Sequence, residues 1–191
     1  MVDELWLVRH GETEWSAAGR HTSTTDLPLT DRGSEQARVL APVLAGTSFT
    51  LVVTSPRRRA VQTARLAGFE DTAADPDVAE WDYGDYEGVT TPTIRETEPG
   101  WTVWSHGAPG GETAEDVTRR IDRFLRGLES IPGRVLVFSH GHASRCVAAR
   151  WLDLPVTEGG RFTLDTATVS VLGHEHGRRA VACWNSPGGP R

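Results

Sequence analysis

Two histidines and a run of arginines follow apolar segments of the 191-residue chain. They stand in the runs Arg9-His10-Gly11, Ser139-His140-Gly141 and Arg57-Arg58-Arg59. Arginine offers fixed, paired donors to phosphate oxygens. A neutral imidazole can attack phosphorus as a nucleophile, and glycine beside it lets the backbone approach a ligand closely. These residue types in this pattern predict a pocket for a phosphoryl group.

The pattern of apolar residues predicts the elements that must position these side chains. Period and composition predict strands at 5–8, 50–54, 135–138, 168–172 and 180–184, and helices at 34–44, 57–66, 113–128 and 141–151. Thr113 and Asp116 form a capping signal for the third helix. Strands that alternate with helices indicate an α/β fold with a largely parallel sheet. Ligands of such sheets bind beyond the carboxyl ends of the strands, where the three polar runs would converge.

The organisation that we expect is one three-layer domain over residues 1–191, with a mostly parallel central sheet between helices and a loose tail from about residue 185. The segment 80–111 shows no sustained period but holds Trp81, Trp101 and Trp104. Aromatic residues argue against disorder. We interpret this segment as an ordered excursion that covers the site.

Two other interpretations of the polar residues stay open. A single histidine at a strand end is often structural, and a run of arginines is often a solvated helix face. Because consecutive helical residues point about 100° apart, at most one or two arginines of 57–59 can face one site. His140-Gly-His142 and His174-Glu-His176 could bind a metal, although neither matches a known zinc motif. Residues 174–177 are more typical of a polar turn.

Composition excludes several classes of protein. The 20 basic and 26 acidic residues give a net charge of −6, which argues against a nucleic-acid binder. The absence of lysine excludes Schiff-base catalysis and a P-loop. Two cysteines make no disulfide framework, and no stretch has the features of a signal peptide or a membrane span. We expect a cytoplasmic protein with no membrane partner.

Five motifs in order resemble the histidine phosphatase superfamily, the phosphoglycerate-mutase-like proteins, and above all its small actinobacterial acid phosphatases. They are Leu7–Thr13, Leu29–Gly33 with Gln36-Ala37, Ser55–Ala64, Glu80 with Tyr83-Gly84 and Glu87-Gly88, and Gly110–Glu112 with Ser139–Gly141. The resemblance spans nearly the whole chain. It implies a phosphoglycerate-mutase-like fold and phosphoryl chemistry without a cofactor.

The resemblance also implies roles for individual residues. His10 would become phosphohistidine, and Arg9 and Arg59 would clamp the phosphoryl oxygens, since the family places its arginine directly before the alanine. His140 would donate to the phosphoryl group, and Glu80 would protonate the leaving oxygen and then activate water. Further pocket residues would be Ser16, Thr22, Ser23, Trp81, Tyr83, His106, Gly141 and His142, of which His142 would offer its peptide N–H to phosphate. Ser16 stands where many members have asparagine.

The resulting prediction is a metal-independent phosphatase that hydrolyses small phosphomonoesters through a phosphohistidine. The mechanism requires a neutral His10 and a protonated Glu80, and both protonation states are best populated at about pH 5–6. The alternatives are a phosphoglycerate mutase, a metal-dependent hydrolase and a binding protein with an inactive site. The chain lacks the longer insertion of the mutases between Glu80 and the next helix. Exposed aromatic residues there would suit the pocket or a homodimer interface equally.

Overall fold

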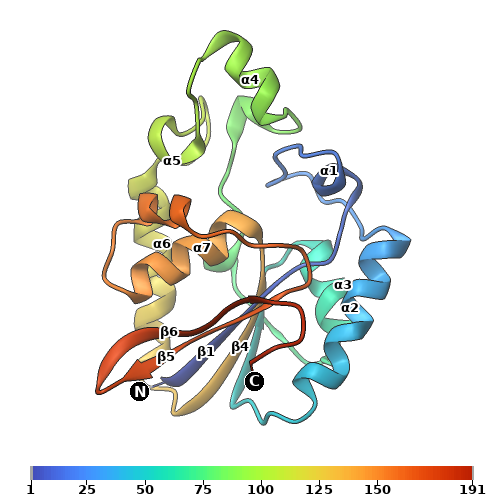
Figure 1. Cartoon of the computed structure of the whole chain (residues 1–191), viewed down its shortest axis with the longest axis vertical. Coiled ribbons are helices and arrows are strands. Elements are labelled where there is room, and N and C mark those ends of the chain that lie inside the picture. The colour runs from blue at the N-terminus through green and yellow to red at the C-terminus, as the bar shows by residue number, and fades with distance from the viewer. Residues whose placement is uncertain (1, 191) are drawn as a thin grey trace.

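Six strands form one sheet in the order β3-β2-β4-β1-β5-β6 in the computed structural model, which describes residues 2–190 (Figure 1). The pairs of β1 with β4, β2 with β4 and β2 with β3 are parallel, and β5 and β6 add two antiparallel pairings. The predicted mostly parallel sheet is confirmed. The strands are β1 Val2–Arg9, β2 Leu51–Thr54, β3 Ala73–Ala74, β4 Gly133–Ser139, β5 Val169–Glu175 and β6 Arg178–Ser186.

Helices cover both faces of the sheet. α2 (Asp31–Leu44) and α3 (Arg58–Leu66) lie on one face, and α6 (Ala114–Leu128) and α7 (Gly141–Trp151) on the other (Figure 1). In β1, Leu5 and Leu7 join the core under α6 and α7, whereas Trp6 and Val8 join the core under α2 and α3. Since successive side chains of a strand point to opposite faces, a strand covered on both sides is a continuous apolar run. This is the three-layer α/β domain that the sequence predicts.

The helix that was predicted from Thr113 begins with a complete capping box. The Thr113 hydroxyl oxygen accepts the backbone N–H of Asp116 at 3.1 Å, and the Asp116 carboxylate accepts the N–H of Thr113 at 3.0 Å. Two N–H groups that the helix itself cannot satisfy are thereby paired. This start fixes α6 directly after Glu112, a residue of the site described below.

The excursion of residues 80–111 is ordered and stands beyond the helices of the main body (Figure 1). It contains the 3₁₀ turn η2 (Gly84–Tyr86) and the short helices α4 (Thr91–Thr97) and α5 (Val103–His106). Trp81 and Trp101 are fully buried, so the expectation of exposed aromatics is wrong for these two. Trp101 links two parts of the excursion, because its indole N–H donates to the carbonyl of Gly107 at 2.9 Å.

Several short elements escaped the sequence analysis. They are β3, α1 (Glu14–Ala17), and the 3₁₀ turns η1 (Pro76–Val78) and η3 (Val156–Arg161). None is long enough to show a period. The chain from residue 185 is also better ordered than expected: β6 extends to Ser186, whose hydroxyl donates to the carbonyl of the buried Gly189. Arg191 lies outside the described residues. Within residues 2–190 no helix has the length and apolar character needed to cross a bilayer.

Candidate active site

The carboxyl ends of β1, β4 and β2 lie side by side, with β4 in the middle. The register pairs Arg9 with Ser139 and Thr54 with Phe138, so the three strands end at one level. The residues that follow them therefore meet, and the ring centroids of His10 and His140 are 5.2 Å apart. Strand order thus brings together two histidines that lie far apart in the sequence.

His10 is held in one neutral form. It is buried, and its Nδ1 lies 2.7 Å from the carbonyl oxygen of Gly11. A carbonyl oxygen can only accept, so Nδ1 carries the proton and the lone pair is left on Nε2. Burial, together with the charges of Arg59 and Arg9, holds the pKa of His10 well below its ordinary value of 6.5. This is the protonation state that a nucleophilic imidazole needs.

Arg59 and His140 form a fully buried pair next to His10. Nε of Arg59 donates to Nδ1 of His140 at 3.1 Å, so the neutral His140 ring carries its proton on Nε2, which lies 2.7 Å from the Ser55 hydroxyl oxygen. Burial and the Arg59 charge lower the pKa of His140 far below 6.5. The two terminal nitrogens of Arg59 donate to the backbone carbonyls of Thr22, Ser23 and Thr25. One N–H on Nη1 remains without a partner in this set of bonds.

The resemblance implies that Arg59 and His140 donate to the phosphoryl group. In the structure their polar atoms contact protein partners, and neither residue lines the adjacent cavity. The carbonyls of loop 22–25 surround the guanidinium of Arg59. Only its last Nη1 N–H stays available for a ligand.

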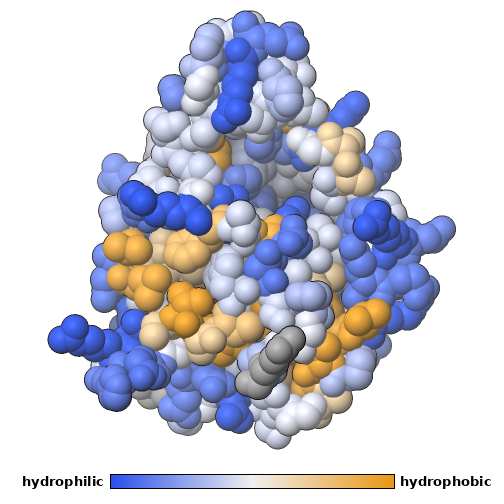
Figure 2. Space-filling model, viewed as in Figure 1, coloured by the Kyte–Doolittle hydropathy of each residue, from blue (hydrophilic) through white to orange (hydrophobic). Residues whose placement is uncertain are grey.

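A cavity of about 180 Å³ opens beside His10, between α1, the start of α7 and the excursion. Figure 2 shows the surface hollowed below the excursion. Arg9 lines this cavity, and although its Nη1 donates to the carbonyl of Leu164, its buried Nε has no partner among residues 2–190. Buried donors are nearly always satisfied. The guanidinium is therefore placed to bind an anion. The predicted residues lining the cavity are Arg9, His10, Ser16, Thr22, Glu80, Tyr83, Gly141 and His142.

Glu80 lines the same cavity with its carboxylate seated on the N-terminus of α7. One oxygen, Oε2, accepts the N–H of His142 at 3.0 Å. The other, Oε1, accepts the N–H groups of Ala143 at 2.8 Å and of Trp81 at 3.0 Å. A helix N-terminus favours an anion through its free N–H groups and its dipole. The expected contact between phosphate and the N–H of His142 is thus made by an internal carboxylate instead.

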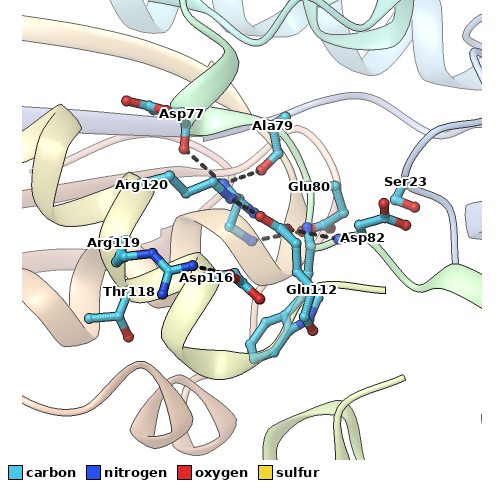
Figure 3. A network of polar contacts seen from close by, with 12 residues as sticks. Ser23, Asp77, Ala79, Glu80, Asp82, Glu112, Asp116, Thr118, Arg119 and Arg120 are labelled. Carbon is cyan, nitrogen blue, oxygen red and sulfur yellow. Dashed lines mark hydrogen bonds and ion pairs between the residues drawn. The ribbon is translucent and has the colours of Figure 1, made fainter. Parts of the chain in front are cut away.

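An ion pair behind Glu80, between the buried Arg120 and the partly buried Glu112, fixes the segment that carries Glu80 (Figure 3). Arg120 donates to both carboxylate oxygens of Glu112, at 2.7 and 2.9 Å, and to the carbonyls of Asp77 and Ala79 at 2.7 and 2.8 Å. Glu112 in turn accepts the N–H of Asp82 at 3.0 Å. The chain on both sides of Glu80 is thereby held against α6. Glu112 has its oxygens in this network and does not line the cavity.

Tyr83 fixes the ring of His142. The two side chains meet with the Tyr83 oxygen 2.6 Å from Nδ1 of His142. Burial raises the pKa of Tyr83 well above 10 and lowers that of His142 well below 6.5. Tyr83 therefore keeps its proton and His142 stays neutral, and one hydrogen bond joins the Tyr83 hydroxyl to Nδ1 of His142. Both His140 and His142 have protein partners for their Nδ1 atoms, and residues 2–190 hold no group of three or more metal-ligating side chains.

Three predicted pocket residues do not line the cavity. Ser23 donates its hydroxyl to Glu87 at 2.6 Å, and its carbonyl accepts from Arg59. Trp81 is buried and donates its indole N–H to the carbonyl of Glu112 at 2.9 Å. His106 is exposed and borders a separate depression beside α5. Ser16 does line the cavity, but its hydroxyl donates to the carbonyl of Thr13 at the start of α1.

The two glycines that follow the histidines have different neighbours. A Cβ on Gly141 would lie 3.5 Å from Cζ of Arg9, so Gly141 borders the cavity as expected. A Cβ on Gly11 would lie 2.3 Å from the carbonyl oxygen of Gly33. Gly11 is therefore required by the close approach of α2.

The sequence analysis missed five residues of the cavity, namely Gly19, Arg20, His21, Arg145 and Leu164. Arg145 follows Gly141 by four positions on a helix, so the helical period was a usable signal. The other four lie outside helices and extended strands, where no period can indicate which way a side chain points.

The geometry agrees with the comparison to known families. A model of the histidine phosphatase superfamily (branch 1) matches residues 5–187. The chain belongs to the histidine phosphatase superfamily. This histidine phosphatase domain is similar to an acid phosphatase of Mycobacterium tuberculosis, with 47% identity over 98% of this chain and 94% of the relative.

Two further similarities bear on this histidine phosphatase domain. A sedoheptulose 1,7-bisphosphatase of Saccharomyces cerevisiae is 38% identical over 78% of this chain and 68% of the yeast protein. The solved structure of a functionally characterised open reading frame product of Mycobacterium tuberculosis superposes with a TM-score of 0.94, at 46% identity, covering 97% of this chain and 98% of that chain. The family and fold that the sequence motifs implied are confirmed.

Proposed function

We propose that this chain is a phosphatase of the acid-phosphatase type, which hydrolyses small phosphomonoesters through a phosphohistidine on His10 and needs no metal ion. The observation that carries the proposal is the neutral His10, with its lone pair on Nε2, which lines a cavity together with Arg9. The names of the mycobacterial and yeast relatives support hydrolysis of small phosphorylated substrates. Two free cysteines, Cys146 and Cys183, agree with a cytoplasmic location.

The reaction has two displacements at phosphorus. In the first, the lone pair of Nε2 forms a bond to phosphorus while the bond to the leaving oxygen breaks, and Glu80 gives that oxygen a proton. In the second, water attacks the phosphohistidine, Glu80 takes a proton from the water, and the bond to Nε2 breaks. Arg9 stabilises the charge on the phosphoryl oxygens in both steps, and donors of this kind contribute about 10²–10³-fold to a rate.

A quenched-flow experiment tests the proposed nucleophile. Enzyme mixed with labelled substrate and stopped in alkali should carry label in an acid-labile, alkali-stable bond to histidine. His10→Ala should remove both the label and the turnover while the protein stays folded. His176→Asn, at the exposed turn between β5 and β6, is the control. Label on serine or aspartate, or more than a few per cent of activity in His10→Ala, would contradict the assignment.

The mutase alternative differs only in the second displacement, where a substrate hydroxyl attacks in place of water. Incubation with 3-phosphoglycerate separates the two reactions when exchange between isomers and release of free phosphate are both measured. We expect free phosphate. A chelator should leave turnover unchanged, whereas loss of activity on chelation would favour a metal-dependent hydrolase.

A further inference from the structure

The carboxylate of Glu87 collects its hydrogen bonds from one loop. Glu87 follows η2 in the excursion, is partly buried and does not line the cavity beside His10. Its Oε2 accepts the backbone N–H of Ser23 at 2.9 Å and the Ser23 hydroxyl at 2.6 Å, and its Oε1 accepts the N–H of Thr25 at 2.9 Å. Burial raises the pKa of Glu87, but these bonds outweigh burial and leave the pKa below its ordinary value of 4.5. An ionised acceptor holds its donors more strongly than a neutral one, so Glu87 fixes the loop that supplies them.

Loop 22–25 faces Arg59 with its carbonyl groups. Nη2 of Arg59 donates to the carbonyls of Thr22 and Ser23, each at 3.2 Å, and Nη1 donates to the carbonyl of Thr25 at 3.1 Å. Ser23 and Thr25 therefore donate to Glu87 and accept from Arg59. The loop contains no helix or strand, so its conformation depends on such contacts. It lies between an anion of the excursion and a buried cation.

Arg59 passes this constraint to the two histidines. Its Nε donates to Nδ1 of His140 at 3.1 Å, which leaves the His140 proton on Nε2, next to the Ser55 hydroxyl. Burial and the charge of Arg59 together hold the pKa of His10 well below 6.5. A guanidinium that lost its carbonyl acceptors could rotate, and its Nε would then no longer be fixed toward His140.

A second set of bonds docks the excursion beside this loop. The N–H of His21 donates to the carbonyl of Val89 at 3.0 Å, and the N–H of Gly88 donates to the carbonyl of His21 at 2.8 Å. These backbone bonds do not involve the side chain of Glu87. A change of that side chain should therefore loosen loop 22–25 and leave the excursion in place.

We infer that Glu87 is a positioning residue for the reaction at His10. It acts from outside the cavity: it holds loop 22–25, the loop carbonyls orient Arg59, and Arg59 fixes the tautomer of His140 beside the nucleophile. The inference rests on the proposed phosphatase activity and adds to it a residue of the excursion that does not touch the substrate.

The variant Glu87→Gln tests the effect on turnover. The amide keeps the size of the side chain but replaces one acceptor oxygen by a donor, which meets the N–H groups of the loop. We expect kcat on p-nitrophenyl phosphate to fall by about 10- to 100-fold, the scale of a small misplacement of catalytic groups. KM should change much less, because Arg9 keeps its place in the cavity. Glu98→Gln is the matched control, since Glu98 lies in the same excursion and its carboxylate accepts the hydroxyl of Tyr86 instead.

Nitrogen NMR of protein with isotope-labelled histidine tests the positioning directly and needs no substrate. Near neutral pH the wild-type spectrum should show His140 with a protonated Nε2 and an unprotonated Nδ1, assigned from the signals lost in His140→Asn. In Glu87→Gln these signals should shift toward the mixture of tautomers of an unrestrained imidazole, and in Glu98→Gln they should not. A side chain that only stabilised the fold would lower Tm and leave the tautomer of His140 unchanged in spectra recorded well below Tm.

Ser23→Ala keeps the inference testable if Glu87→Gln does not fold. It removes one bond to Glu87, so it should lower kcat and shift the His140 signals in the same direction by smaller amounts. In the double variant the two losses should add up to less than their sum, because both substitutions disrupt the same contact. Unchanged His140 signals in Glu87→Gln, or unchanged turnover, would overturn the inference. Wild-type enzyme that hydrolyses no phosphomonoester would contradict the proposed function instead, and the spectra would still show whether Glu87 positions His140.

Discussion

The backbone N–H of His142 donates to the Glu80 carboxylate at 3.0 Å. The family resemblance implies that the same N–H contacts phosphate, so a phosphoryl group and the Glu80 carboxylate would compete for one donor on α7. We expect a phosphoryl group bound there to displace the carboxylate from the helix N-terminus, which would leave Glu80 free to turn toward the leaving oxygen.

Replacement of Glu80 should therefore affect substrates unequally. Glu80→Gln removes the proton donor, which matters most when the leaving group is a basic alkoxide. We expect kcat/KM to fall by about 10²-fold or more on an alkyl phosphate, the usual scale of general acid catalysis. The loss on p-nitrophenyl phosphate should be markedly smaller, because p-nitrophenol leaves without a proton. Equal losses on both substrates would show a binding or folding role for Glu80.

The ion pair of Arg120 and Glu112 should contribute to stability as well as to activity. Arg120→Met removes the side-chain donor of the Glu112 carboxylate, which keeps the N–H of Asp82, and also removes the Arg120 donor of the carbonyls of Asp77 and Ala79. Because Arg120 is buried and Glu112 is partly buried, we expect a loss of about 2–3 kcal/mol in the free energy of unfolding, measurable by urea denaturation. Arg123→Met is the control, because the exposed Arg123 pairs with Asp77 at the surface, where a pair is worth about 1 kcal/mol or less. Equal effects of the two variants would contradict the role of the network.

Stability should fall as the pH is lowered below about 6.5. The pKa values of His10, His21, His140 and His142 are all depressed by burial, that of His21 to about 4. Between the folded and unfolded pKa values, the unfolded chain binds protons that the native protein excludes. Stability is therefore complete above the unfolded pKa and is lost as the pH falls toward the folded values. Enzyme working at pH 5–6 would do so on this slope.

Melting temperatures measured from pH 7.5 to pH 4.5 check this dependence. His21→Asn should reduce the slope, since one excluded proton is removed, whereas His176→Asn should not change it. A melting temperature that stays constant down to pH 4.5 would contradict the prediction.

Gly11→Ala should destabilise the protein by about 1–3 kcal/mol, the usual cost of an overpacked site. The added Cβ would meet the carbonyl oxygen of Gly33, which belongs to rigid backbone. Gly46→Ala is the control, because a Cβ there meets nothing within 4 Å. Chemical denaturation measures both variants, and a neutral Gly11→Ala would show that α2 can move away from the loop.

The positions of His10, His140 and Arg59 near one another were predictable because they depend on strand ends. Each follows a continuous apolar run, and parallel strands end at a common edge. Their individual partners were not predictable. The contact of Arg59 with the carbonyls of Thr22, Ser23 and Thr25 depends on the path of a loop without period. The hydrogen bonds of the Glu80 carboxylate to the N-terminus of α7 likewise depend on contacts between segments far apart in the sequence.

In the excursion, too, the sequence predicted the order of the segment but not the partners of its side chains. Its three tryptophans predicted order correctly, since aromatic side chains must be buried somewhere. The sequence pattern did not predict which tryptophan lies near the site. The indole N–H of Trp81 donates to the carbonyl of Glu112, whereas the ring of Trp104 stacks on the guanidinium of Arg145.

The place of β1 between β4 and β5 has a consequence for the nascent chain. β1 is made first, but both of its neighbours in the sheet come from the last third of the sequence. Contacts between residues so distant in the sequence form slowly, and an unpaired apolar strand is prone to aggregate until they do. Leu5–Val8 therefore leave the ribosome long before their partners are synthesised. β1, and with it His10, must therefore wait until β4 and β5 are synthesised before it can enter the sheet.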